Sequence, residues 1–239
     1  MGALSSSGLA YINHYAPLHY LPWIARDRAL LSKTELRKRG FGDSHFRSTS
    51  WKQDSSRGFK DYAFLTIDTY PRILNAKLNA GFPHVAISVP AAEVEKTEYS
   101  LCRYNIARTR VLKKGNLPGR PEGNGNGRYY NTQQVPVANS DEDRIALLDK
   151  HLGVNMIEVL VPGKLWLNHN SRILVYSKKD YKIAKNILLR CKRDWGVELV
   201  EPSGPYNRRD DYGASIIEFV NRCLEDPNWK GNGLDFDRV

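Results

Sequence analysis

Glu158 is the residue of this 239-residue chain whose setting most strongly suggests chemistry. It lies in the run Val154-Asn-Met-Ile-Glu-Val-Leu-Val161, whose composition predicts a strand. Strand alternation places Glu158 on one face with Val154, Met156 and Leu160. A carboxylate among apolar neighbours is costly if it is buried without a partner. Two interpretations follow: Glu158 reaches a ligand or cation in a cleft, or it belongs to a structural ion pair or strand edge.

His14 raises the same question in an earlier run, Tyr11 to Tyr15, which predicts a first strand. A single histidine on a strand can be a satisfied core residue or a ligand-binding one. A metal site is not indicated, because His14 and His19 are five residues apart and no cysteine or acidic residue nearby completes a ligand set. Three scattered cysteines exclude a zinc ribbon or disulfide scaffold and favour a cytoplasmic protein.

The positive charge of the chain is concentrated in two segments. The sequence has 36 Lys and Arg against 26 Asp and Glu, a net charge of +10. Residues 26–60 contain ten basic and four acidic residues, and residues 103–128 contain seven basic residues and one acidic residue. This distribution favours a phosphate-binding surface, and two solvated basic faces are the alternative. No apolar run approaches the roughly 20 residues that a membrane span needs, so we expect no membrane partner.

The remaining pattern predicts one domain, residues 1–239, of mixed α and β structure. Strands are expected near 11–15, 62–67, 84–89, 99–106, 154–161, 172–176 and 197–200. Helices are expected over 18–31, 71–80, 141–151, 180–195 and 214–224, with a helical turn at 93–96. Basic loops near 34–60 and 113–134, the second rich in Gly and Asn, are expected to be mobile. Irregular alternation of strands and helices argues against a parallel doubly wound sheet.

Several of these segments resemble the DarT-type ADP-ribosyltransferases. His14, with an aromatic-rich helix ending in Ala29-Leu-Leu31, is similar to the family's NAD-binding His-x-Thr strand. Met156-Ile-Glu-Val-Leu-Val161 is similar to the strand of its catalytic glutamate. Asp61-Tyr-Ala-Phe-Leu65 and Pro71-Arg-Ile-Leu74 resemble elements that line its nicotinamide pocket. Two positions depart from the pattern, because Ala16 replaces the family's Thr and Ile157 replaces its usual Ala.

The resemblance implies an α+β fold, an ADP-ribosyltransferase-like split twisted β-sandwich with an NAD cleft and surrounding helices. Glu158 would be catalytic and would hold the nicotinamide ribose, and His14 would bind the ribose on the adenosine side. Arg47 is the best match to the family's arginine, which pairs with an NAD phosphate or activates the acceptor. The cofactor-binding candidates are His14, Ala16, Tyr62 and Tyr70. No metal is implied.

The family modifies bases in single-stranded DNA, and related members modify RNA. Clustered cations beside aromatic side chains are typical of single-strand binding. The nucleic-acid-binding candidates are Trp51, Arg103, Arg108, Arg110, Lys113, Lys114, Arg120 and Arg128. The sequence therefore predicts an NAD-dependent mono-ADP-ribosyltransferase that modifies a base in single-stranded DNA, as a toxin or phage-defence effector held by an antitoxin protein. The alternatives are the same chemistry on single-stranded RNA and an inactive nucleic-acid-binding module, for which Ala16 leaves room.

Overall fold

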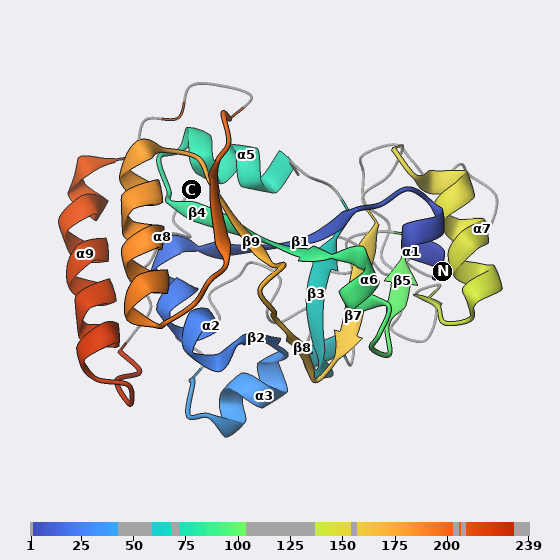
Figure 1. The fold of residues 1–239 in the computed structure, drawn as a ribbon, viewed down its shortest axis with the longest axis horizontal. Coiled ribbons are helices and arrows are strands. Elements are labelled where there is room, and N and C mark those ends of the chain that lie inside the picture. Colours follow the sequence, from blue (N-terminus) through green and yellow to red (C-terminus); the bar gives the residue numbers. More distant parts are fainter. Residues whose placement is uncertain are drawn as a thin grey trace, which may run out of the picture.

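The structure is a computed structural model and describes residues 2–42, 59–67, 72–103, 137–153, 157–202, 206 and 209–231. An eight-stranded sheet has the order β10-β9-β4-β1-β3-β7-β5-β6 (Figure 1). Its strands are β1 (Tyr11–Pro17), β3 (Tyr62–Thr66), β4 (His84–Pro90), β5 (Ser100–Cys102), β6 (Val137–Ala138), β7 (Glu158–Pro162), β9 (Arg172–Val175) and β10 (Gly196–Leu199). A second sheet pairs β2 (Ala29–Leu31) with β8 (Lys164–Trp166).

The helices are mostly short. The α-helices are α1 (Ala3–Ser6), α2 (Leu21–Asp27), α3 (Lys33–Lys38), α5 (Arg72–Asn79), α6 (Ala91–Val94), α7 (Asp141–His151), α8 (Lys178–Arg190) and α9 (Asp210–Glu225). Two 3-10 turns, η1 (Leu18–Tyr20) and η3 (Phe59–Asp61), precede α2 and β3. No helix in the described part of the chain is long and apolar enough to span a membrane.

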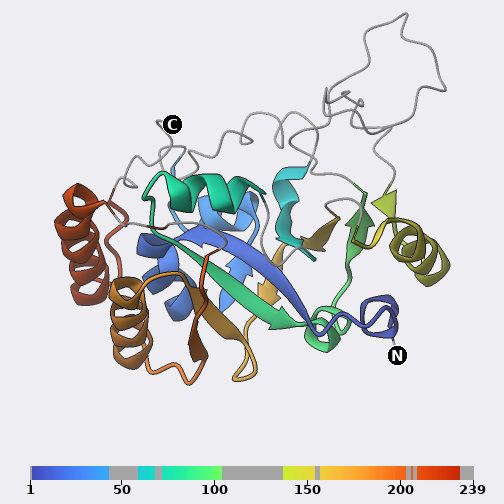
Figure 2. The ribbon, with the colours of Figure 1, turned by 90° about the horizontal axis from the view of Figure 1, so that it is seen from above.

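Helices cover both faces of the β4 end of the large sheet (Figure 2). On one face, Leu74 and Leu78 of α5 pack with Tyr176 and Tyr15. On the other face, Ala184, Ile187 and Leu188 of α8 join the main hydrophobic cluster with Ile87 of β4 and Ile173 of β9. The alternating side chains of each strand therefore meet two different apolar layers, as period-2 alternation requires.

Side-chain caps determine where several helices begin. The Ser140 hydroxyl accepts a hydrogen bond from the Asp143 N–H (3.1 Å) at the start of α7. Three acidic residues in the first turn of α7 stabilise it by interacting with the positive end of the helix dipole. Ser177 caps α8 in the same way, through the Asp180 N–H. The chain leaves α5 at Gly81, whose φ of +82° suits glycine.

Most sequence-based elements are confirmed, but several boundaries are wrong. The helix expected over 18–31 ends at Asp27, because Arg28 adopts a left-handed conformation (φ 52°) and residues 29–31 form β2. The helix expected over 180–195 covers Lys178–Arg190, and the one expected over 214–224 covers Asp210–Glu225. The segment from residue 34, expected to be a loop with at most one helical turn, begins with the six-residue helix α3, which Ser32 caps. Residues 43–58 and 104–136 of the predicted loops lie outside the described residues.

Candidate NAD cleft

The large sheet is split between β1 and β3. β1 pairs with β4 through seven residues, and β3 pairs with β7 through five. By contrast, β1 and β3 share one registered pair, Asn13 with Thr66. Strands β3, β7 and β5 consequently run at a steep angle to β1 and β4 (Figure 1). The sheet thus consists of two half-sheets that are joined at one point.

His14 lies next to this junction and bridges the two half-sheets. Its Nδ1 lies 2.7 Å from the carbonyl oxygen of Phe64 in β3. A carbonyl oxygen only accepts, so Nδ1 carries the proton in this hydrogen bond. Burial lowers the pKa of His14 below its ordinary value of 6.5, and the bond to Phe64 opposes that shift only in part. The ring is therefore neutral near pH 7, and its Nε2 is a hydrogen-bond acceptor.

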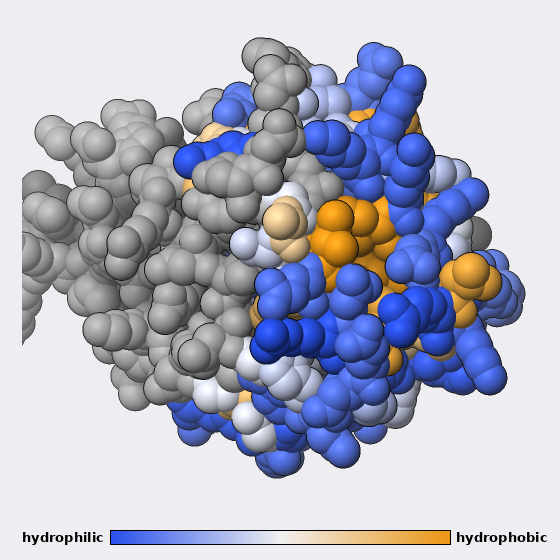
Figure 3. Space-filling view, turned by 90° about the vertical axis from the view of Figure 1, so that its left-hand side faces the viewer, coloured by the Kyte–Doolittle hydropathy of each residue, from blue (hydrophilic) through white to orange (hydrophobic). Residues whose placement is uncertain are grey.

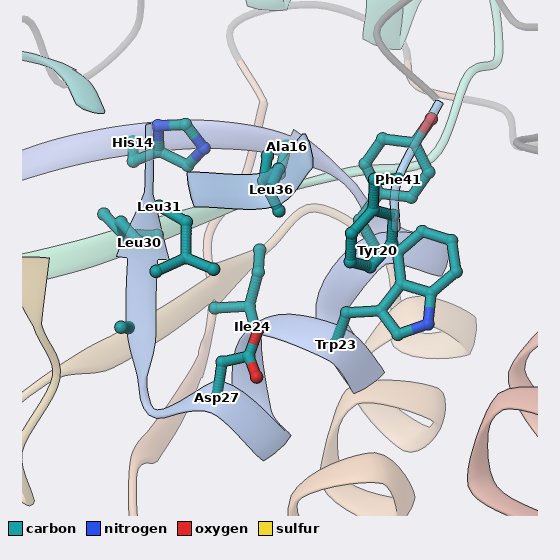
Figure 4. A pocket seen from close by; sticks show the side chains of 11 residues that line it. His14, Ala16, Tyr20, Trp23, Ile24, Asp27, Leu30, Leu31, Leu36 and Phe41 are labelled. Atoms are coloured by element: carbon teal, nitrogen blue, oxygen red, sulfur yellow. The ribbon is translucent and has the colours of Figure 1, made fainter. Parts of the chain in front are cut away.

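A pocket of about 120 Å³ lies beside His14 (Figure 4). Its walls come from β1, η1, α2, β2, α3 and Phe41, and they are mostly apolar. The lining residues are His14, Ala16, Tyr20, Trp23, Ile24, Asp27, Ala29, Leu30, Leu31, Leu36 and Phe41. In the close-up His14 lies at one end of the pocket and Trp23 at the other (Figure 4). This volume is below the roughly 300–1,000 Å³ of complete small-molecule sites, so it suits one end of a dinucleotide.

Asp27 supplies the carboxylate of this pocket. It forms an ion pair with Arg39, in which the guanidinium Nη1 donates to Oδ1, and Arg39 follows the end of α3. Both side chains are partly exposed, at 37% for Arg39 and 21% for Asp27. The pair therefore connects α2 to the segment after α3 at the edge of the pocket.

Glu158 belongs to a row of buried polar residues that crosses the junction. It pairs with Thr66, Thr66 pairs with Asn13, and Asn13 pairs with Ser88 of β4. Directly paired residues in antiparallel strands point to the same face. The relative exposures of Glu158, Thr66, Asn13 and Ser88 are 8%, 7%, 1% and 3%. The Ser88 hydroxyl donates to Asn13 Oδ1, and the Thr66 hydroxyl donates to the Ile157 carbonyl at 3.2 Å.

The predicted alternation of this strand is confirmed from residue 157 onward, and Val154 and Met156 lie outside the described residues. Ile157, Val159 and Val161 belong to the main hydrophobic cluster, whereas Leu160 packs with Phe59 and Cys102 on the other face. Glu158 shares the face of Leu160, and Cys102 of β5 is its other cross-strand neighbour. Asn13, Thr66 and Ser88 carry no local signal in the sequence, because their roles depend on strand pairing between distant segments.

The structure brings some predicted site residues together and separates others. His14 and Ala16 line the pocket, while Glu158 and Tyr62 are not among its lining residues. His14 follows Asn13, so alternation directs it to the opposite face of β1 from the row that contains Glu158. Tyr62 packs against Phe59, with ring centroids 5.9 Å apart, and Arg103 directly follows β5 and is partly buried.

The other predicted positions lie outside the described residues: Arg47, Trp51, Tyr70, Arg108, Arg110, Lys113, Lys114, Arg120 and Arg128. Within the described ranges, no group of three or more His, Cys, Asp or Glu side chains is placed to hold a metal ion.

Comparison with known proteins gives a structural match and no sequence match. No protein-family model and no curated protein sequence matches the chain. Its structure is similar to Thermus sp. 2.9 DarT in complex with ADP-ribosylated ssDNA, with a TM-score of 0.56 and 15% sequence identity. That alignment covers 81% of this chain and 95% of the other. The chain has the fold of DarT.

Two further DarT structures from Thermus sp. 2.9 agree with this match. The complex with NAD+ aligns with a TM-score of 0.54 at 13% identity, and the complex with carba-NAD+ with 0.55 at 14%. Each alignment covers 81% of this chain and 96% of the other. The predicted fold class, mixed α+β with a large twisted sheet, is confirmed. Here the two halves remain one hydrogen-bonded sheet through the Asn13–Thr66 pair.

Proposed function

We propose that this chain is an NAD-dependent mono-ADP-ribosyltransferase that modifies a base in single-stranded DNA. The observation that carries the proposal is the split sheet. His14 lies beside an apolar pocket on one face of it and Glu158 is buried at the junction on the opposite face, so NAD would reach both residues across the split. The DarT structures with this fold were determined with NAD+ and with ADP-ribosylated ssDNA. Single-stranded RNA is the alternative acceptor.

The pocket residues fit one end of NAD. Nε2 of the neutral His14 ring can accept a hydrogen bond from a ribose hydroxyl. Trp23, Tyr20 and Phe41 supply aromatic walls for a planar base. Ala16 lines the same pocket without the hydroxyl of the family's threonine, so His14 carries more of the polar recognition.

Glu158 would act where the glycosidic bond of nicotinamide breaks. NAD supplies an activated ribose carbon from which nicotinamide leaves, through an oxocarbenium-like transition state. A carboxylate placed nearby stabilises the developing positive charge. The same carboxylate can take the proton that the attacking base loses as its bond to the ribose forms. An unpaired strand is the natural acceptor, because a base inside a duplex cannot reach the cleft.

Such an activity would damage its own cell if it were unchecked, and we include an antitoxin protein in the proposal. Tyr62, Tyr70 and Arg47 remain proposed site residues, as do the cations of residues 103–128. An inactive nucleic-acid-binding module is the second candidate, which the missing hydroxyl at Ala16 favours.

Mass spectrometry distinguishes these candidates. The chain is incubated with NAD and a mixture of single-stranded DNA and RNA oligonucleotides, and the mass of each oligonucleotide is then measured. A gain of one ADP-ribosyl group on DNA supports the main proposal, and a gain on RNA alone supports the alternative. Oligonucleotide binding without any gain in mass supports the inactive module.

A further inference from the structure

Trp166 is an exposed tryptophan on the strand that pairs with one wall of the pocket. It ends β8, where Lys164 and Trp166 are exposed and Leu165 between them is buried. Its relative exposure is 55%, although tryptophan is usually well buried. It pairs with Ala29 of β2, and residues 29–31 of β2 line the pocket. A large aromatic ring therefore faces solvent one strand away from the candidate NAD site.

One cation lies over this ring, and the segment that contains the partner strand β2 is basic. The Lys164 Nζ lies 4.3 Å from the Trp166 ring centroid, and the carbonyl of the exposed Arg28 accepts the Leu167 N–H at 2.7 Å. Residues 26–39 and Lys164 include seven basic residues against two acidic ones. Two of these cations pair with the two carboxylates, Arg39 with Asp27 and Lys38 with Glu35. The nearby Asp61, which accepts from the Thr34 hydroxyl, adds one further acidic side chain. This surface therefore favours an anionic partner with planar groups.

We propose that Trp166 is a stacking platform for an unpaired base of a single-stranded nucleic acid, with Lys164 and Arg28 contacting the adjoining phosphates. The proposal rests on the proposed function for its choice of ligand. An exposed cation–π contact is weak, so Lys164 can leave the ring for a phosphate when a base stacks there. Aromatic stacking accepts every base, because each base has a π-face.

The position of Trp166 defines which nucleotide it would take. Four residue steps along β7 separate Glu158 from Pro162, about 13 Å at strand spacing. β8 begins after the Gly163 turn, which the Gly163 N–H anchors to the Asp61 carbonyl at 2.7 Å. Trp166 lies beyond this turn, in the second sheet, so the platform would hold a nucleotide other than the reacting one.

Oligonucleotide affinity tests this proposal without NAD. Fluorescence anisotropy measures the binding of labelled single-stranded oligo-dT and oligo-rA to the full chain at several salt concentrations. Trp166→Ala should weaken binding about 5- to 100-fold, and Trp166→Phe should weaken it less. Lys164→Gln should weaken it and reduce the salt slope by about 1.

The matched control is Leu189→Ala. The side of the molecule formed by α8 and α9 carries an apolar area among hydrophilic residues (Figure 3), and Leu189 of α8 is 75% exposed. This control should bind as the unsubstituted chain does. Thermal melting verifies that each variant is folded.

Each outcome decides the proposal. The proposal is overturned if Trp166→Ala binds the oligonucleotides as tightly as the unsubstituted chain does. It is also overturned if Leu189→Ala loses as much affinity as Trp166→Ala, or if the unsubstituted chain binds no oligonucleotide. A selective loss in Trp166→Ala supports it, even if no ADP-ribosyl transfer is ever detected. In that case the proposed enzymatic function is wrong, and the proposed role of Trp166 in nucleic-acid binding is retained.

Discussion

The imidazole of His14 spans the split in the sheet and binds the backbone of the other half, with Nδ1 2.7 Å from the Phe64 carbonyl oxygen. This contact orients the ring, holds it in one tautomer and leaves Nε2 as an acceptor. The two half-sheets are otherwise joined through the Asn13–Thr66 pair in the described register. The split between the half-sheets therefore positions a residue whose Nε2 can bind a ligand in the pocket beside it.

Replacing His14 should weaken NAD binding. His14→Ala removes the acceptor, and we expect Kd to rise about tenfold, near 1.4 kcal/mol. Isothermal titration calorimetry measures the change, and His169→Ala, at an exposed histidine, is the control. Burial lowers the pKa of His14 below 6.5, so NAD affinity should be constant between about pH 7 and 8. The affinity should decrease only at pH values well below about 6.5, where protonation of Nε2 removes the acceptor. An unchanged Kd in His14→Ala would remove His14 from the site.

Position 16 offers a matched pair of substitutions. Ala16→Thr and Ala16→Val add nearly the same volume to the pocket, but threonine alone adds a hydroxyl. If the pocket holds the ribose end of NAD, the Thr variant should bind NAD about 3- to 10-fold more tightly than the Val variant. Calorimetry on both proteins measures the ratio, and equal affinities would show that no NAD group hydrogen-bonds there.

The Thr66 hydroxyl should affect catalysis more than NAD binding. Thr66 is the cross-strand partner of Glu158, and its hydroxyl binds the Ile157 carbonyl, one residue before the carboxylate. Thr66→Val should lower stability by about 1 kcal/mol and lower kcat, with the Kd for NAD unchanged, and Thr66→Ser should restore kcat. Thr97→Val is the control, because its hydroxyl makes a similar bond to the Val94 carbonyl at 2.7 Å. Equal kcat losses in the two Val variants would reduce Thr66 to a structural role.

Acid should destabilise the fold through His19. This side chain is fully buried, with its ring centroid 4.3 Å from that of Tyr20 and 4.9 Å from that of Phe219. Burial, and then the nearby His84, lower its pKa well below 6.5. The unfolded chain therefore binds a proton that the folded chain excludes, and stability falls as the pH drops below about 6.5.

Urea unfolding at a series of pH values measures this effect. Between about pH 6.5 and 5.5, one such histidine removes up to about 1.4 kcal/mol of the free energy of unfolding. His19→Phe should flatten this dependence, whereas the exposed control His169→Asn should retain it. A pH profile that is the same in His19→Phe and the unsubstituted chain would exclude His19 as its source.

Sequence alone predicted the elements whose periodicity is long enough to be recognised. The alternation around Glu158 is one example, and helix α7 behind its Ser140 cap is another. The short strands β2 and β8 have only three residues each, and β2 lies directly after a helical pattern, so no periodicity reveals them.

The arrangement of the candidate site needed long-range information. The row of Glu158, Thr66 and Asn13 depends on the register of three strands from separate parts of the sequence. The exposure of Trp166 depends on β8 pairing with β2, at the edge of the pocket. Neither relationship leaves a local pattern, which is why the sequence indicated Glu158 and His14 but not their neighbours.

Transfer of label from NAD to single-stranded DNA, measured side by side for the unsubstituted chain, Glu158→Gln and Glu201→Gln, tests the central claim most directly. Glu201 is exposed, so its substitution controls for the loss of one carboxylate. We predict transfer by the unsubstituted chain and Glu201→Gln, and a loss of at least about 100-fold in Glu158→Gln with NAD binding retained. Undiminished transfer by Glu158→Gln, or no transfer by any of the three proteins to DNA or RNA, would contradict the account.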